Sequence, residues 1–259
     1  MSDSNFEIVE GDPTSSVILH VPHSSRVIPD EIRSQLLLAD RELEIELDEM
    51  TDSKTDQLAL DARIRTDIKP WIFRNTLSRL VIDPERFPDE REAMNAIGMG
   101  AVYQRTSFGE KLRDPIPARD QQLIERYFEP YSKALEALVR KVLINRGAVT
   151  LVDVHSYRIN EHSNSLNKGQ RRPPVCLGVD AFHTPSWLID AARNAFSSLG
   201  EIVINEPYAG TYVPLSMYET EQGVTSVMME NREDLLHGEG LPRAAAALAQ
   251  LIGAIESRA

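Results

Sequence analysis

Two histidines directly follow apolar runs of the sequence, in positions where they could bind a metal. His23 comes after the run 17–21, and His155 comes after the run 148–154. A neutral imidazole at the end of a rigid strand is a good zinc ligand, and a catalytic zinc usually takes three protein ligands and a water. The alternative is that each histidine is a satisfied residue of the core. We take His23 and His155 as the leading candidates for metal ligands.

Carboxylates near these runs could complete such a site. Asp153 precedes His155 by two residues, so it points to the same side of a strand and could orient an imidazole. Asp52 and Asp56 are four residues apart, which places both on one face of a helix. Their alternative interpretation is a helix cap and a solvated charge. Glu230 follows a third apolar run, where a carboxylate can serve as general base and then general acid, or else pair with an arginine.

Arginines in one segment could bind an anionic substrate. Arg79 and Arg86 lie in SRLVIDPER, and planar guanidinium groups bind carboxylates in a bidentate manner. For Arg86 the alternative is a surface pair with Glu85 or Asp89. Segment 87–119 follows, with several arginines and glycines but no clear periodicity. Such a long irregular excursion is often a lid over a site.

The elements that must position these residues alternate along the chain. We expect strands over 16–21, 71–73, 79–83, 148–154, 175–179, 201–205 and 225–229. We expect helices over 29–38, 50–65, 120–146, 185–199 and 241–257. This alternation predicts an α/β fold, a three-layer sandwich with a mostly parallel or mixed sheet and helices on both faces, in a single domain over residues 1–259. Ligand sites of such sheets lie beyond the carboxyl ends of the strands, where the candidate residues fall.

Composition excludes several classes of function. The 259 residues carry 28 Lys and Arg against 40 Asp and Glu, a net charge of −12. Phosphate binding relies on clustered positive charge, so neither nucleic acid nor an anionic membrane is an expected partner. No apolar run reaches the roughly 18–20 residues that span a bilayer, and residues 1–10 show no signal-peptide pattern, so a cytoplasmic location is expected. The one cysteine, Cys176, excludes an internal disulfide, and neither a phosphate-binding loop nor a Gly-x-Ser-x-Gly elbow is present.

Six motifs in a fixed order resemble the N-formylglutamate amidohydrolase family. They are VILHVPHSS, TDSKTD, SRLVIDPER, LVDVHSY, NEPYAGTY and VMMENR, and together they extend over about residues 17–232. The family is similar in fold to zinc carboxypeptidases and aspartoacylases. The resemblance implies one zinc bound by His23 and His155, and Glu230 as the general base. It implies that Arg79 and Arg86 bind the substrate carboxylate and polarise the scissile carbonyl.

The sequence departs from that pattern at two places. Carboxypeptidases have a His-x-x-Glu pair, whereas Arg26 stands three residues after His23, so the acidic ligand must come from elsewhere. We assign it to Asp52 in the TDSKTD segment, with Asp56 as the alternative. The second departure is Asp-Pro-Glu-Arg in place of the Asn-Arg pair of many relatives. Glu85 then stands where an amide would help to hold the substrate.

These residues predict a metal-dependent amidohydrolase with one Zn²⁺ per chain and a small anionic substrate. The substrate implied by the resemblance is N-formyl-L-glutamate, cleaved to formate and L-glutamate. Arg86 would stabilise the oxyanion, Arg79 would hold the carboxylates, and Tyr212 or Tyr208 would close the pocket. The alternatives are hydrolysis of another N-acyl amino acid or a small peptide, and a metal-free module in which Arg79 and Arg86 bind an anionic small molecule. The oligomeric state is not fixed by the sequence.

Overall fold

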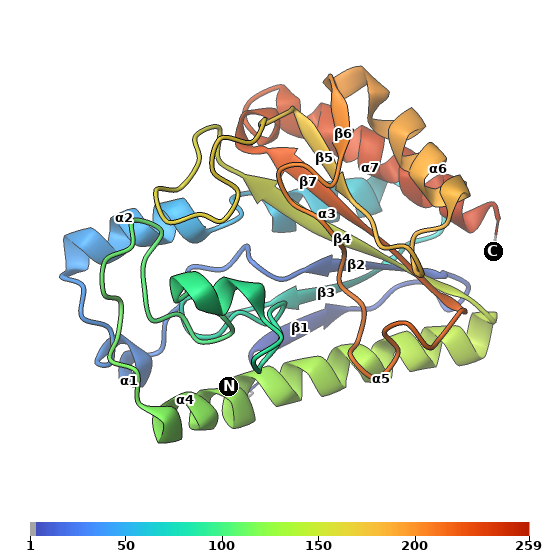
Figure 1. Ribbon diagram of the computed structural model, residues 1–259. Helices are drawn as coiled ribbons and strands as arrows, with labels where there is room; N and C mark the ends of the chain where they lie inside the picture. Colours follow the sequence, from blue (N-terminus) through green and yellow to red (C-terminus); the bar gives the residue numbers. More distant parts are fainter. Residues whose placement is uncertain (1–3, 259) are drawn as a thin grey trace.

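The computed structural model describes residues 4–258 and is built on one seven-stranded mixed sheet (Figure 1). The strand order is β1-β3-β2-β4-β7-β5-β6. The strands are β1 (Phe6–Val9), β2 (Val17–Val21), β3 (Trp71–Asn75), β4 (Val149–Tyr157), β5 (Val175–Gly178), β6 (Ile202–Ile204) and β7 (Val224–Arg232). The central strands β3, β2, β4 and β7 are parallel, while β1 and β5 pair with their neighbours β3 and β7 in the antiparallel sense. The expected α/β class is confirmed.

Helices cover both faces of this sheet. One face carries α3 (Thr55–Arg65), α6 (Ser186–Phe196) and α7 (Gly240–Glu256), and α5 (Glu129–Arg146) runs along the other (Figure 1). The short helices α1 (Asp30–Arg33) and α4 (Pro117–Leu123) and the longer α2 (Asp40–Met50) lie near the carboxyl ends of the central strands. Among the described residues, no helix combines the length and the apolar character that crossing a bilayer requires.

The two faces of the central strands differ in chemistry. On the side of α3, α6 and α7, the middle of each central strand presents apolar residues to the main core, such as Val152, Val154 and Val227. On the side of α5, strand β4 begins with Val149 and Leu151, which pack in a second apolar cluster. The same face of β4 then continues with polar residues, because side chains alternate along a strand. Apolar residues at the start of the strands thus pack against α5, and the same face presents polar residues toward the carboxyl ends of the strands.

The predicted strand over 79–83 is wrong. Leu80, Val81 and Ile82 are fully buried, but the backbone there forms turns. Val81 N–H donates to the carbonyl of Ser78, and the apolar side chains pack in two small clusters beneath α1, α2 and segment 87–119. A buried apolar run therefore does not become a strand when local turns satisfy its backbone. The edge strand β1 takes the remaining place in the sheet and was not expected.

The helices also differ in their limits. The expected helix over 29–38 is only α1, and α2 was not expected. The expected helix over 50–65 begins at Thr55, because residues 51–54 form a turn in which Lys54 has a positive φ of 70°. The helix expected over 120–146 contains a π-turn at Ile124–Phe128, just before Pro130, which cannot donate a backbone hydrogen bond.

Candidate active site

Three central strands bring the candidate residues to one place. His20 on β2 is paired in register with Asp153 on β4, and His155 on β4 is paired with Glu230 on β7. All four side chains lie on the α5 face of the sheet, at or near the carboxyl ends of the strands. Together with His23, which follows β2, they are almost completely buried. The strand-end placement expected from the sequence therefore holds for this group.

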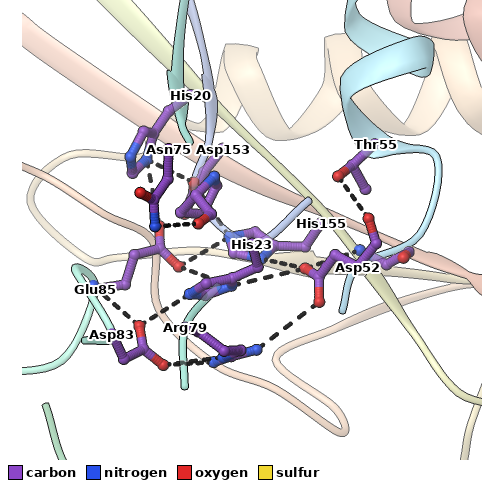
Figure 2. Close-up of polar contacts among 12 residues, drawn as sticks. His20, His23, Asp52, Thr55, Asn75, Arg79, Asp83, Glu85, Asp153 and His155 are labelled. Carbon is purple, nitrogen blue, oxygen red and sulfur yellow. Dashed lines mark hydrogen bonds and ion pairs between the residues drawn. The ribbon is translucent and has the colours of Figure 1, made fainter. Parts of the chain in front are cut away.

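Two imidazoles and one carboxylate converge at this point (Figure 2). The Nδ1 atoms of His23 and His155 are 3.3 Å apart. Asp52 Oδ2 lies 2.9 Å from Nδ1 of His155 and 3.7 Å from Nδ1 of His23. Three donors that share a tetrahedral zinc at about 2.0–2.2 Å must lie roughly 3.3–3.5 Å from one another. The donor types and their spacing therefore fit a zinc ion, with both histidines presenting Nδ1.

The turn before α3, rather than a helix, places Asp52. Its backbone N–H donates to the carbonyl of His23, and its own carbonyl accepts from the hydroxyl of Thr55. Ser156 N–H also lies 3.3 Å from the Asp52 carboxylate. Asp56 lies in the first turn of α3 instead, and its side chain is 40% exposed and lies 3.6 Å from Arg74. The spacing argument for one shared helix face is wrong, because Asp52 precedes the helix.

Carboxylates also lie close to the Nε2 atom of each of the two imidazoles. Nε2 of His23 is 2.9 Å from Asp83, and Nε2 of His155 is 3.1 Å from Glu85 and 3.2 Å from Asp153. The contact of His23 is a hydrogen bond, whereas Nε2 of His155 lies close to its two carboxylates without a hydrogen bond among the described residues. A carboxylate at the outer nitrogen of a ligating histidine favours one tautomer and orients the ring. This arrangement leaves Nδ1 of both rings for a cation. Glu85 also lies 3.8 Å from His23 Nδ1, so His23, Glu85 and His155 form a second set of donors that could hold an ion.

His20 lies between α5 and the carboxylates of the site and contacts both. Its Nδ1 is 2.9 Å from Asp153 and 3.3 Å from Glu85, and its Nε2 is 2.6 Å from the hydroxyl of Tyr131 on α5. Burial lowers the pKa of His20, but the two carboxylates outweigh burial and raise it to about 9. His20 is therefore a buried cation at neutral pH that keeps Asp153 and Glu85 charged and in place.

Asp83 connects the two arginines to the histidine pair. Arg79 donates two hydrogen bonds to its Oδ2, at 2.6 and 3.1 Å, and Nε of Arg86 is 3.5 Å away. Tyr103, from segment 87–119, donates to the same oxygen at 2.7 Å. Burial raises the pKa of Asp83, but Arg79 and His23 outweigh burial and hold it well below its usual range. The sequence motif contained Asp83 and Glu85, but their contacts with the histidines could not be read from it.

Glu230 completes the site from the neighbouring strand. It lines the same cavity of about 560 Å³ as His23, Asp52 and His155. Its Oε2 is buried without a hydrogen-bond partner in the described part of the chain, and burial raises the pKa of the carboxyl to about 8. A buried carboxyl with an open oxygen is suited to take up and release a proton. The alternative of an ion pair between Glu230 and an arginine is not found among the described residues, and the nearby Arg232 pairs with Asp234.

The remaining predicted residues line the cavity in different ways. The Tyr212 ring packs on His20, with ring centroids 4.8 Å apart, so it lies beneath the histidines. Tyr208 packs against Tyr157 in an edge-to-face contact, and the Arg172 guanidinium lies over the Tyr208 ring. Segment 87–119 supplies one wall of the cavity. It is anchored to α2 where the buried Glu46 accepts hydrogen bonds from the N–H and hydroxyl of Ser107.

Comparison with known proteins agrees with this architecture. A sequence model of the family described as N-formylglutamate amidohydrolase matches residues 15–237. The chain belongs to the N-formylglutamate amidohydrolase family. No curated protein matches the sequence. Membership in this family identifies the chain as an amidohydrolase-like enzyme.

Two solved structures show the same fold. One is the crystal structure of N-formylglutamate amidohydrolase from Ralstonia eutropha JMP134, with a TM-score of 0.80 at 20% identity, covering 98% of each chain. The other is a gene product of Agrobacterium tumefaciens, with a TM-score of 0.73 at 20% identity, covering 98% of this chain and 96% of that one. At 20% identity, the likeness to these two structures establishes the fold of this chain and nothing further.

Proposed function

We propose that the chain hydrolyses the amide bond of an N-acyl amino acid with the help of one divalent metal, zinc by its ligand types. The observation that carries the proposal is the convergence of His23 Nδ1, His155 Nδ1 and Asp52 Oδ2 beside the open carboxyl of Glu230. The family is named for the hydrolysis of N-formyl-L-glutamate, and we propose this compound as the first substrate to test.

His23, Asp52 and His155 would hold the metal. When bound, the ion would polarise the scissile carbonyl and lower the pKa of a water. Glu230 takes a proton from that water as its oxygen adds to the acyl carbon. Glu230 then delivers the proton to the amide nitrogen, the C–N bond breaks, and the products are a carboxylic acid and the free amino acid.

The arginines divide the remaining tasks. Arg79 lies 3.8 Å from Asp52 and is held rigidly by Asp83, so it is placed to stabilise negative charge on the acyl oxygen. The guanidinium of Arg86 makes no hydrogen bond among the described residues and forms only a 3.5 Å ion pair with Asp83 through Nε, so its other nitrogens can bind the substrate carboxylate. This division exchanges the roles that the sequence predicted for the two arginines.

The proposal is tested with purified protein and a panel of N-formyl and N-acetyl amino acids. We expect about one zinc per chain by elemental analysis, and amidase activity that a chelator removes and added zinc restores. Protein that hydrolyses the panel equally well after complete metal removal would contradict the metal-assisted mechanism. Protein that binds acidic ligands without metal and hydrolyses none of them would support the alternative of a binding module.

A further inference from the structure

A second group of possible metal ligands lies next to the proposed zinc site (Figure 2). It consists of His20, Glu85 and Asp153, whose donor atoms all lie within 4.8 Å of one another. Nδ1 of His20 is 2.9 Å from Asp153 Oδ1 and 3.3 Å from Glu85 Oε1. One imidazole nitrogen and two carboxylate oxygens at this spacing suit a divalent ion such as zinc or manganese. We call this group the inner site, and none of its residues is a ligand of the proposed zinc.

The inner site has more negative than positive charge. Among the described ion pairs, Glu85 and Asp153 contact only histidines. The imidazole of His155 must be neutral when it binds the first zinc, which leaves His20 as the one cation that faces the two carboxylates. Glu85 Oε1 and His155 Nε2 are also buried without a hydrogen-bond partner in the described part of the chain. A divalent ion would balance both carboxylates and give Glu85 Oε1 a partner, while Glu85 Oε2 stays 3.1 Å from His155 Nε2.

The protein also holds the outer polar atoms of these ligands. His20 Nε2 is 2.6 Å from the hydroxyl of Tyr131, which can accept the N–H of a ligating imidazole. Asp153 Oδ2 accepts from the backbone N–H of Tyr212 at 3.4 Å, so Oδ1 remains for the ion. Such outer contacts orient the ligands of a metal and tune its affinity. Glu85 and Asp153 line the cavity, so an ion can reach the inner site from there.

We propose that His20, Glu85 and Asp153 bind a second divalent cation, which offsets the negative charge of Glu85 beside the substrate. In the absence of this ion, the charge of Glu85 in the cavity wall opposes the binding of an anionic N-acyl amino acid. With the ion bound, the cavity is less negative and the substrate binds more tightly. The ion must displace a proton from His20, so the inner site fills at a higher metal concentration than the first site. The effect on the substrate rests on the proposed amidohydrolase function, whereas the metal site does not.

The test counts the ions bound by metal-free protein after equilibrium dialysis against excess zinc. We expect two zinc ions per chain in the wild type and one in Glu85→Gln, which loses a charged ligand of the inner site. The control is Glu49→Gln, which removes the same charge from another part of the cavity wall and should keep both ions. A wild type that saturates with one ion, or an equal loss in the two variants, would overturn the proposal.

Two further variants identify the ligands of the second ion. Asp153→Asn should also bind one zinc, because it removes the other carboxylate of the inner site. Asp52→Ala removes a ligand of the first site and should still bind one zinc when zinc is in excess. If Asp153→Asn keeps two ions while Glu85→Gln loses one, the second ion lies between Glu85 and the other two histidines of the cavity, and the inner site is overturned.

Steady-state kinetics test the effect on the substrate. As the second ion binds, the wild-type KM for N-formyl-L-glutamate should fall about threefold or more, while the KM of Glu85→Gln should not respond to zinc at these concentrations. A wild-type KM that stays constant as the second ion binds would overturn the proposed effect on the substrate. Absence of any turnover would overturn the proposed function, and the zinc counts would still decide whether the inner site exists.

Discussion

Removal of the charge on Asp83 should weaken both the fold and the metal site. Asp83 is fully buried, accepts from Arg79 and Tyr103 on one oxygen, and contacts His23 on the other. In Asp83→Asn the new amide nitrogen meets either Arg79 or His23 as a second donor. Breaking a buried ion pair by neutralising one partner costs roughly 3–5 kcal/mol. For a chain of this size, 3 kcal/mol corresponds to a melting temperature lower by about 6–12 °C.

The same change should loosen the metal, because His23 loses the carboxylate that orients its ring. Loss of such an outer contact typically lowers metal affinity about 10–100-fold. Thermal denaturation of the metal-free protein measures the first effect, and competition with a chromogenic zinc chelator measures the second. The control is Asp114→Asn, on an exposed pair with Lys111, which should change neither quantity. If Asp83→Asn melts and binds zinc like this control, Asp83 does not connect the arginines to the metal site.

Three further predictions follow from single contacts. Glu230→Gln should retain zinc but lower kcat about 10²–10⁴-fold, and near-normal turnover would exclude Glu230 as the proton carrier. Asp52→Ala should lose zinc in elemental analysis while Asp56→Ala retains it, and the reverse result would restore Asp56 as the ligand. Burial raises the pKa of Glu46 from 4.5 to about 7, so its protonation costs the fold nothing below about pH 4.5, and stability is lost as the pH rises from there through 7. Between pH 5 and 8, Glu46→Gln should therefore gain about 2–3 kcal/mol in free energy of unfolding relative to the wild type, and parallel pH profiles would contradict this.

The sequence predicted those parts of the site that depend on single strands. His23, His155 and Glu230 follow buried apolar runs, and the period of a strand is enough to place them at one edge of the sheet. The class of fold was predictable for the same reason, since strands and helices alternate over most of the chain. The family resemblance pointed to the TDSKTD segment for the acidic ligand, but neither it nor the spacing could separate Asp52 from Asp56.

The parts that could not be predicted depend on contacts between distant segments. Leu80 to Ile82 read as a strand, because the sequence does not reveal that α1 and segment 87–119 cover them. The roles of Asp83 and Glu85 depend on where the 79–86 turn meets the two histidines. The separate tasks of Arg79 and Arg86 likewise depend on which of them Asp83 binds, and a linear spacing does not contain that information.

The position of β7 affects the order in which the enzyme can assemble during synthesis. This strand is formed near the end of the chain, yet it lies between β4 and β5 in the middle of the sheet. Until residues 224–232 have left the ribosome, β4 and β5 each keep an open hydrogen-bonding edge, which is a feature prone to wrong pairing. His155 also has no Glu230 beside it at that stage. A nascent chain could thus gather its two histidines and Asp52 early, but it becomes a complete catalyst only when the last strand is inserted.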